Sequence, residues 1–185
     1  MDNKLEKWTR KSPLEVLEGL NLTDPPFNPF LIAKKIGIKV KRDVDWDKLA
    51  HDGEIYLDKK NNPEIWINPT VHDNRQNFTM AHELGHLLYD VIPDIDKFIS
   101  PIHDGYDTMK RDGAKNSKEY RANNFASALL MPKAPIIKAG NKLIKEYNES
   151  HDGKKISKDI LISGLAIQFE VSEQALAIRL KKLGL

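Results

Sequence analysis

The segment from Phe78 to Asp90, FTMAHELGHLLYD, contains two histidines four residues apart, with a glutamate directly after the first. On an α-helix, His82 and His86 would lie about 40° apart around the axis and about 6 Å apart along it. Two imidazoles at this spacing can bind one metal ion. Glu83 lies on the adjoining strip, where its carboxylate can reach a water on that ion but is poorly placed to be a ligand. The spacing therefore predicts a metal site with a carboxylate base beside it.

The alternative is that the H-E-x-x-H pattern arose by chance on a helix face exposed to solvent. The other residues of this helix distinguish the two interpretations. The pattern predicts a helix from about Asp73 to Val91, with side chains that fall into two halves. The apolar half, which should face the core, consists of Met80, Ala81, Leu84, Leu87, Leu88 and Val91. The polar half consists of Arg75, Thr79, His82, Glu83, His86 and Asp90. Because the histidines lie apart from the leucines, the segment favours a metal site over a chance match.

A catalytic zinc usually has three protein ligands and one open position. Asp90 continues the series of residues four apart, but it lies about 12 Å along the helix axis from His82. One ion therefore cannot bind His82, His86 and Asp90 together. The metzincin pattern requires Gly and His three and six residues after the second histidine. This chain has Tyr89 and Ile92 there, which excludes that subclass.

The best candidate for a third ligand is Glu119, in SKEYRANNFASALLMP. We predict a helix that is capped by Ser117, ends at Met131 and Pro132, and buries Ala122, Phe125, Ala126, Leu129 and Leu130. Glu119 falls on the same side, and an inward carboxylate is costly unless a charge meets it. The alternative is that Glu119 only stabilises the N-terminus of this helix. Asn123, one turn further on, could orient the carboxylate, face solvent or pack between helices.

Composition limits the other kinds of chemistry. With 185 residues the chain fits one domain with or without a small appendage, and its net charge of +2 argues against a dedicated polyanion binder. The absence of cysteine excludes disulfides, Cys-ligated zinc and thiol catalysis, so a metal must use His, Asp or Glu. The charged N-terminus lacks a secretory h-region, and no apolar run approaches the length of a membrane span. We therefore expect a cytoplasmic protein without a membrane segment.

The remaining elements suggest what positions the predicted site. The expected elements are a helix after the cap Asn28 and Pro29 that ends at Gly37, a strand at 38–44, a β-hairpin of GEIYL and EIWIN around DKKNNP, and three C-terminal helices with breaks near HDGKK and before Ser172. Between Val91 and Ser117 the pattern indicates a long loop, either a lid or a disordered segment. His103, Tyr106 and Tyr120, in or just after this loop, could stabilise an oxyanion, but surface or packing roles account for them as well.

Together these residues resemble the ImmA/IrrE family of metallopeptidases. The resemblance rests on NFTMAHELGHLLYD and EYRANNFASALLMP, with weaker similarity in FLIAKKIGIKV, in IWINP and in the last 21 residues. It implies that His82 and His86 are metal ligands, Glu83 the general base and Glu119 the third ligand. It also implies an α+β fold with a small antiparallel or mixed sheet packed against a zincin-type metal-bearing helix, followed by a helical C-terminal region. At Asp90 the chain departs from the family, which often has His there; we place Asp90 outside the site.

The resemblance further implies a zinc-dependent endopeptidase of the bacterial cytoplasm. Its protein substrate would be a helix-turn-helix repressor of the XRE type, cleaved to derepress mobile-element, prophage, toxin–antitoxin or stress genes. Two imidazoles and a carboxylate suit Zn²⁺ best, with Mn²⁺ or Fe²⁺ as weaker candidates. We divide the chain into a zincin-like domain at 1–132 and a helical C-terminal subdomain at 133–185 packed on it.

The C-terminal segment LAIQFEVSEQALAIRLKKLGL has the outline of a helix-turn-helix, with Ser172 as N-cap and Gly184 as terminator. The alternative function is therefore a DNA-binding or protein-binding transcriptional regulator with a structural or vestigial metal site. Its basic residues are few, namely Arg179, Lys181 and Lys182, and its apolar residues, Ala175, Leu176, Ile178 and Leu180, suit packing. We therefore favour a packed helical pair and do not expect direct nucleic-acid binding.

Overall fold

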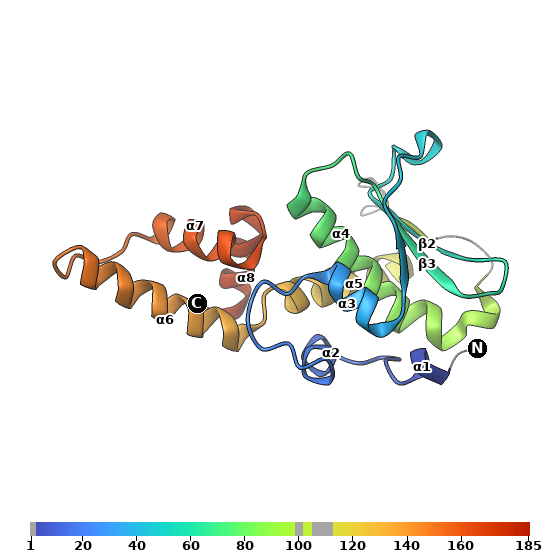
Figure 1. The fold of residues 1–185 in the computed structure, drawn as a ribbon, viewed down its shortest axis with the longest axis horizontal. Coiled ribbons are helices and arrows are strands. Elements are labelled where there is room, and N and C mark those ends of the chain that lie inside the picture. Colours follow the sequence, from blue (N-terminus) through green and yellow to red (C-terminus); the bar gives the residue numbers. More distant parts are fainter. Residues whose placement is uncertain (1–2, 99–101, 105–112) are drawn as a thin grey trace.

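The computed structural model describes residues 3–98, 102–104 and 113–185, in an α+β fold with a small mixed sheet (Figure 1). The described elements are α1 (Asn3–Glu6), α2 (Pro13–Gly19), α3 (Pro29–Ile36), β1 (Lys39–Lys41), η1 (Trp46–Lys48), β2 (Gly53–Leu57), β3 (Pro63–Ile67), α4 (Asp73–His86), η2 (Leu87–Val91), η3 (Ile92–Lys97), β4 (Ile102–Asp104), α5 (Gly113–Leu130), α6 (Lys133–Ser150), α7 (Lys158–Phe169) and α8 (Glu173–Leu183). The fold class predicted from sequence is thus confirmed. Among the described residues, none of the helices combines the length and apolar character that crossing a bilayer requires.

Helix α3 has the caps that the sequence predicts. The side chain of Asn28 accepts hydrogen bonds from the backbone N–H groups of Phe30 at 3.0 Å and Leu31 at 3.1 Å. Pro29 occupies the first turn, where its missing N–H costs nothing, and the helix ends at Gly37. Strand β1 follows directly, so α3 delivers the chain to the edge of the sheet.

The four described strands form one sheet in the order β1-β3-β2-β4. The predicted hairpin is confirmed, since β2 and β3 pair antiparallel with Ile55 opposite Ile65. Strand β1 runs parallel to β3, and β4 runs antiparallel to β2. Ile55, Ile65 and Ile67 are fully buried in the core that also holds the apolar side chains of α3 and α4. The sheet therefore fixes the long helix α4 from one side.

Helix α4 begins at Asp73, as predicted, but after His86 it continues as one π-helical turn, η2. Its apolar half faces the core, as expected. Arg75, at the start of its polar half, is exposed, but Thr79, His82, Glu83 and His86 are at most 5% exposed. Helix α5 packs on the part that carries the histidines, and a solvated face is thereby excluded for His82, Glu83 and His86.

The close approach of α4 and α5 depends on a residue without a side chain. A Cβ at Gly85 would lie 3.1 Å from the backbone Cα of Ala122 and 3.2 Å from Cβ of Phe125. Contacts this short would force the two helices apart. Small residues on both helices, as the sequence indicates for Ala122, thus allow the packing that brings α5 to the histidines.

The prediction of one long loop between Val91 and Ser117 is partly wrong. Residues 92–97 form the 3-10 helix η3, residues 102–104 form β4, and α5 begins at Gly113 instead of at Ser117. A proline within the first turn is compatible with a helix start, which explains η3. Strand β4 forms through its pairing with β2, a distant partner that local patterns do not reveal. Residues 99–101 and 105–112, with Tyr106 and the centre of the predicted lid, lie outside the described residues, as does the side chain of His103.

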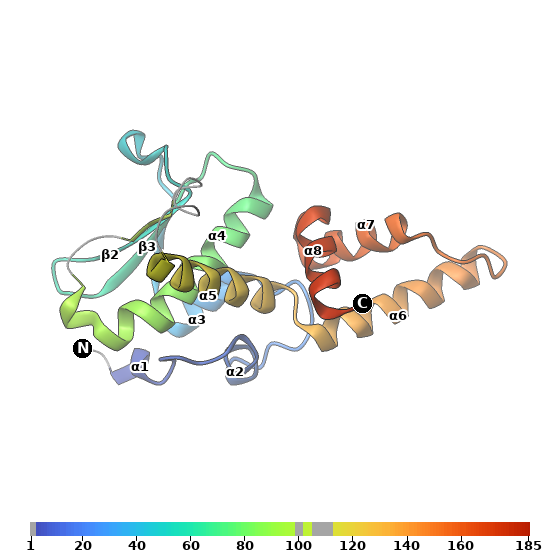
Figure 2. The same ribbon diagram turned by 180° about the vertical axis from the view of Figure 1, so that it is seen from behind.

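The three C-terminal helices have the breaks that the sequence predicts, with Ser157 and Ser172 as N-caps and Gly184 after the last helix. Figures 1 and 2 show α6 and α7 extending away from the sheet, with α8 near their junction with the rest. Arg179 is not offered to a ligand: it is 9% exposed and donates from Nε to the carbonyl of Met131 at 3.0 Å.

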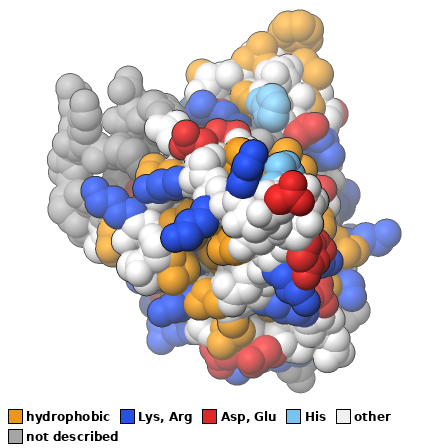
Figure 3. All heavy atoms as spheres, turned by 90° about the vertical axis from the view of Figure 1, so that its left-hand side faces the viewer, with side chains coloured by type: hydrophobic (Ala, Val, Ile, Leu, Met, Phe, Trp, Pro, Cys, Tyr) orange, Lys and Arg blue, Asp and Glu red, His pale blue; other side chains and the backbone are white. Residues whose placement is uncertain are grey.

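Figure 3 shows the face of the molecule that lies on the left in Figure 1. Acidic and basic side chains are interspersed on this face, and no continuous basic patch stands out in that view. Of the expected packing residues, Leu176 is buried, whereas Ile178 is 63% exposed, which contradicts the packing role we expected for it. The division at residue 132 stays a prediction.

Candidate metal centre

Three potential ligands from two helices converge at one point. His82 and His86 come from α4 and Glu119 comes from α5. The two Nε2 atoms are 2.9 Å apart, and the Glu119 oxygens lie 3.3 Å from Nε2 of His82 and 3.2 Å from Nε2 of His86. One ligand atom from each of the three residues lies within 4.8 Å of the others. The structure therefore brings together the three residues that the sequence analysis selected.

The outer nitrogens of both imidazoles are held by oxygen atoms. Nδ1 of His82 lies 3.0 Å from Oδ1 of Asn123, and Nδ1 of His86 lies 3.1 Å from Oδ2 of Asp90. Because both oxygens accept hydrogen bonds, each Nδ1 donates its proton outward and each Nε2 directs a lone pair inward. This arrangement selects the tautomer that binds metal ions in proteins.

Two of these contacts differ from the sequence analysis. Asn123 contacts the ring of His82, whereas the sequence analysis left open that it orients the carboxylate of Glu119, faces solvent or packs between helices. Asp90, which we placed outside the site, is not positioned as a ligand but accepts from His86 and forms ion pairs with Lys118 and Arg121. Its distance from His82 was the wrong criterion, because the spacing of four residues from His86 already predicts that neighbouring contact.

The electrostatics of the cluster attract positive charge. Burial lowers the pKa of His86, but the carboxylates of Asp90 and Glu119 outweigh burial and raise that pKa to about 10. Burial raises the pKa of Glu119, yet hydrogen bonds from His82 and His86 hold it well below its usual range. Inward lone pairs beside a carboxylate repel one another unless a proton or a metal ion lies between them. The donor set and its charge therefore fit a divalent cation, whose binding would displace a proton.

Glu83 is completely buried next to this cluster, beneath the start of strand β2. A Cβ at Gly53 would lie 2.6 Å from Cγ2 of Thr79 and 2.9 Å from Oε1 of Glu83. The strand can approach the carboxylate this closely only because residue 53 has no side chain. Gly53 is not among the site residues predicted from the sequence, although a glycine at the start of a strand indicates a close approach.

Tyr120 does not lie with the histidines. It is 64% exposed on the outer side of α5, where Nζ of Lys182 lies 5.3 Å from the centre of its ring. A hydrogen bond with Asn124 and the charge of Lys182 lower the pKa of its hydroxyl. Among the described side chains, none of the residues suggested from the sequence as oxyanion stabilisers therefore lies at the cluster.

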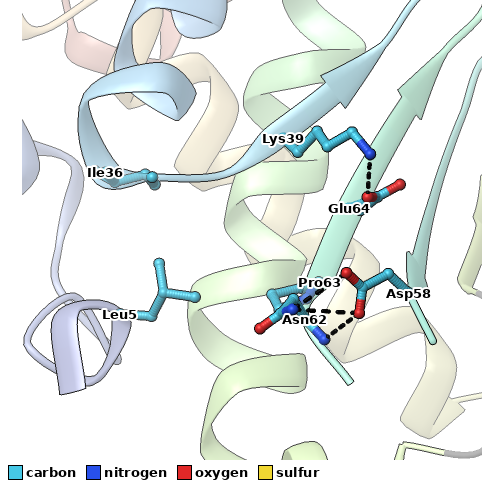
Figure 4. Close-up of a pocket in the computed structure, with 8 residues that line it drawn as sticks. Leu5, Ile36, Lys39, Asp58, Asn62, Pro63 and Glu64 are labelled. Atoms are coloured by element: carbon cyan, nitrogen blue, oxygen red, sulfur yellow. Dashed lines mark hydrogen bonds and ion pairs between the residues drawn. The ribbon is translucent and has the colours of Figure 1, made fainter. Parts of the chain in front are cut away.

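A cavity of about 320 Å³ lies at the opposite end of β2 from Gly53, and it is distinct from the cluster (Figure 4). Its polar side chains bind one another: Lys39 donates to Glu64 at 2.6 Å, and Asn62 donates to Asp58. The hydrogen bond from Lys39 outweighs the burial of the Glu64 carboxyl group and keeps the pKa of Glu64 below its ordinary value. These pairs form a polar network at the edge of the sheet. The histidine cluster therefore remains the candidate site for catalysis.

Replacing Asp90 tests whether the contact to His86 matters for the metal. In Asp90→Ala we expect zinc affinity to fall about 10–100-fold, because His86 loses the acceptor that fixes its tautomer. Asp90→Asn, which keeps an oxygen at this position, should recover part of the loss. Zinc competition against a chromophoric chelator measures both. Asp96→Ala, an exposed acid nearby, is the control, and equal affinities of Asp90→Ala and wild type would exclude the role.

Comparisons with known proteins agree with this geometry. A family model described as the IrrE N-terminal-like domain matches residues 33–181. The radiation response metalloprotease IrrE of Deinococcus radiodurans is 38% identical over 73 residues, which are 40% of this chain and 20% of that protein. A solved transcriptional regulator of Mycobacterium tuberculosis has a TM-score of 0.52 at 14% identity, over 96% of this chain and 46% of that one. That likeness shows the fold alone, and the chain spans about a fifth and under half of these two relatives.

Proposed function

Because this chain belongs to the ImmA/IrrE family of metallopeptidases, we propose that it is a zinc-dependent endopeptidase that cleaves a protein substrate. The observation that carries the proposal is the convergence of His82, His86 and Glu119 within 4.8 Å, beside the buried carboxylate of Glu83. Three such ligands leave one coordination position for water or substrate, as in catalytic zinc sites. Two imidazoles and one carboxylate suit Zn²⁺ better than Mn²⁺ or Fe²⁺.

Zinc, when bound, would acidify a water molecule and polarise the scissile carbonyl. Glu83 takes a proton from the attacking water and later gives it to the amine of the leaving fragment. The C–N bond breaks, the hydroxyl remains on the new carboxyl group, and the proton goes to the new amino group. Asn123 and Asp90 hold the two imidazoles in the required tautomer throughout.

The substrate we propose is a helix-turn-helix repressor of the XRE type, cleaved in the cytoplasm to derepress mobile-element, prophage, toxin–antitoxin or stress genes. The family supports this choice, since its members act on such regulators. Residues 133–185 would then form a helical subdomain packed on the zincin-like domain. The alternative, a DNA-binding or protein-binding regulator, finds less support, because Arg179 is buried and binds Met131.

The test is incubation of the purified protein with the helix-turn-helix repressor encoded nearest its gene. With zinc, we expect cleavage of the repressor at a defined bond, and a chelator should abolish it. An unrelated protein of similar size is the control for specificity. Intact repressor in the presence of zinc would exclude it as the substrate, and salt-dependent DNA binding would favour the regulator.

A further inference from the structure

The connection between β1 and β2 presents a tryptophan to solvent. Trp46 is 80% exposed, whereas the other two tryptophans of the sequence, Trp8 and Trp66, are 6% and 1% exposed. Val44 and Leu49, in the same connection, are 50% and 38% exposed. Large apolar side chains exposed together at one place indicate a binding surface, and tryptophan is enriched among the residues that dominate binding energy.

Anchors on both sides of Trp46 hold this connection in place. Nε1 of Trp66 donates to the carbonyl of Asp43 at 2.9 Å, and Nδ2 of Asn68 donates to the carbonyl of His51 at 3.1 Å. Between them, Lys48 pairs with the buried Glu54 at 3.1 Å. A side chain presented by a fixed backbone loses little conformational entropy on binding.

The connection leads directly into the candidate metal centre. Gly53 follows it and lies against Glu83, and Asp52 accepts from Nε of Arg75 at the start of α4 at 2.9 Å. Trp46 precedes Gly53 by seven residues, so the backbone carries it at most about 25 Å away. An extended peptide of similar length spans the same distance. In Figure 1 the cyan turn at the top is this connection, and hydrophobic side chains form the apex of Figure 3.

The local charge defines the partner. In the run DVDWD, residues 43–47, aspartates alternate with Val44 and Trp46, although the whole chain carries +2. Asp43 and Asp47 are exposed, whereas Asp45 is half-buried. Nζ of Lys48 lies 3.1 Å from the buried Glu54 and 3.9 Å from Asp45, so Asp43 and Asp47 supply most of the negative charge beside Trp46. An apolar surface flanked by carboxylates complements an apolar side chain flanked by lysine or arginine.

We propose that Val44, Trp46 and Leu49, with Asp43, Asp45 and Asp47, form a substrate-binding surface, the Trp46 surface. It binds a basic segment of the protein substrate that carries one large apolar side chain, within about seven residues of the scissile bond. This inference rests on the proposed peptidase activity and adds the sequence class that the enzyme selects.

The test uses a library of peptides produced by digesting a bacterial proteome. Wild type, Trp46→Ala and Ile167→Ala are incubated with the library and zinc, and the cut sites are sequenced. Ile167, which is 79% exposed on α7, is the matched control for loss of an exposed apolar side chain. We expect wild type and Ile167→Ala to select an apolar residue next to Lys or Arg at a fixed distance from the cut. Trp46→Ala should lose this selection.

On one selected peptide, Trp46→Ala should raise KM about tenfold and leave kcat nearly unchanged. A second measurement does not require catalysis. Addition of the same peptide to zinc-loaded Glu83→Gln should protect tryptophan fluorescence from iodide quenching, because Trp46 is the exposed tryptophan. Cleavage with the same profile in Trp46→Ala would overturn the Trp46 surface alone. Absence of zinc-dependent cleavage by wild type would overturn the proposed function and this inference with it.

Discussion

Glu83→Gln is expected to reduce peptide-bond cleavage by at least about 10²–10⁴-fold, the contribution of a positioned general base. The glutamine amide cannot take a proton from water, so the attacking nucleophile is no longer generated beside the carbonyl. The side chain is fully buried and nearly equal in size to glutamate, so the packing against Gly53 and Thr79 should persist. The three potential ligands are untouched, and zinc content should therefore remain that of wild type.

The decisive measurement combines single-turnover cleavage of the repressor with zinc content from the same preparation. Glu18→Gln, the same change at an exposed position of α2, is the control and should behave as wild type. Cleavage at the wild-type rate by Glu83→Gln would remove Glu83 from the mechanism. A loss of zinc together with activity would instead identify Glu83 as part of the metal-binding set.

The local elements of this fold could be predicted from the sequence because local chemistry determines them. Asn28 and Ser172 cap their helices through contacts two or three residues away, and the β2–β3 hairpin is set by alternation around a turn. The histidine pair belongs to the same class, since its geometry follows from helical spacing alone. The common feature is that every partner lies within a few residues.

What could not be predicted depends on distant partners. Strand β4 exists because β2 offers it an unpaired edge, and Gly53 matters because of Glu83, 30 positions later. His82, Glu83 and His86 of α4 are buried because α5 covers them, and no pattern within α4 distinguishes a covered polar face from a solvated one. Asp90 is a different case. Its distance from His82 argues against a shared metal ligand, but that distance says nothing about the contact between Asp90 and His86.

Glu119→Ala is expected to weaken zinc binding by more than the roughly 10–100-fold that replacing an outer partner such as Asp90 costs. It removes a direct ligand and the negative charge that compensates the cation. The alternative role, stabilisation of a helix N-terminus, loses its basis because α5 begins at Gly113, so Glu119 lies beyond the first turn. Loss of a helix-terminal charge would lower stability with and without zinc equally, whereas loss of a ligand acts only when zinc is present.

Thermal unfolding with and without zinc separates the two effects. At a free zinc concentration 100 times the dissociation constant, binding stabilises a protein by about 2.7 kcal/mol. Wild type should therefore unfold at a higher temperature with zinc, while Glu119→Ala should show little or no zinc-dependent increase. Glu146→Ala, at an exposed position of α6, should keep the full increase. An undiminished zinc response in Glu119→Ala would mean that the two histidines bind the ion without α5, and the catalytic geometry proposed above would no longer hold.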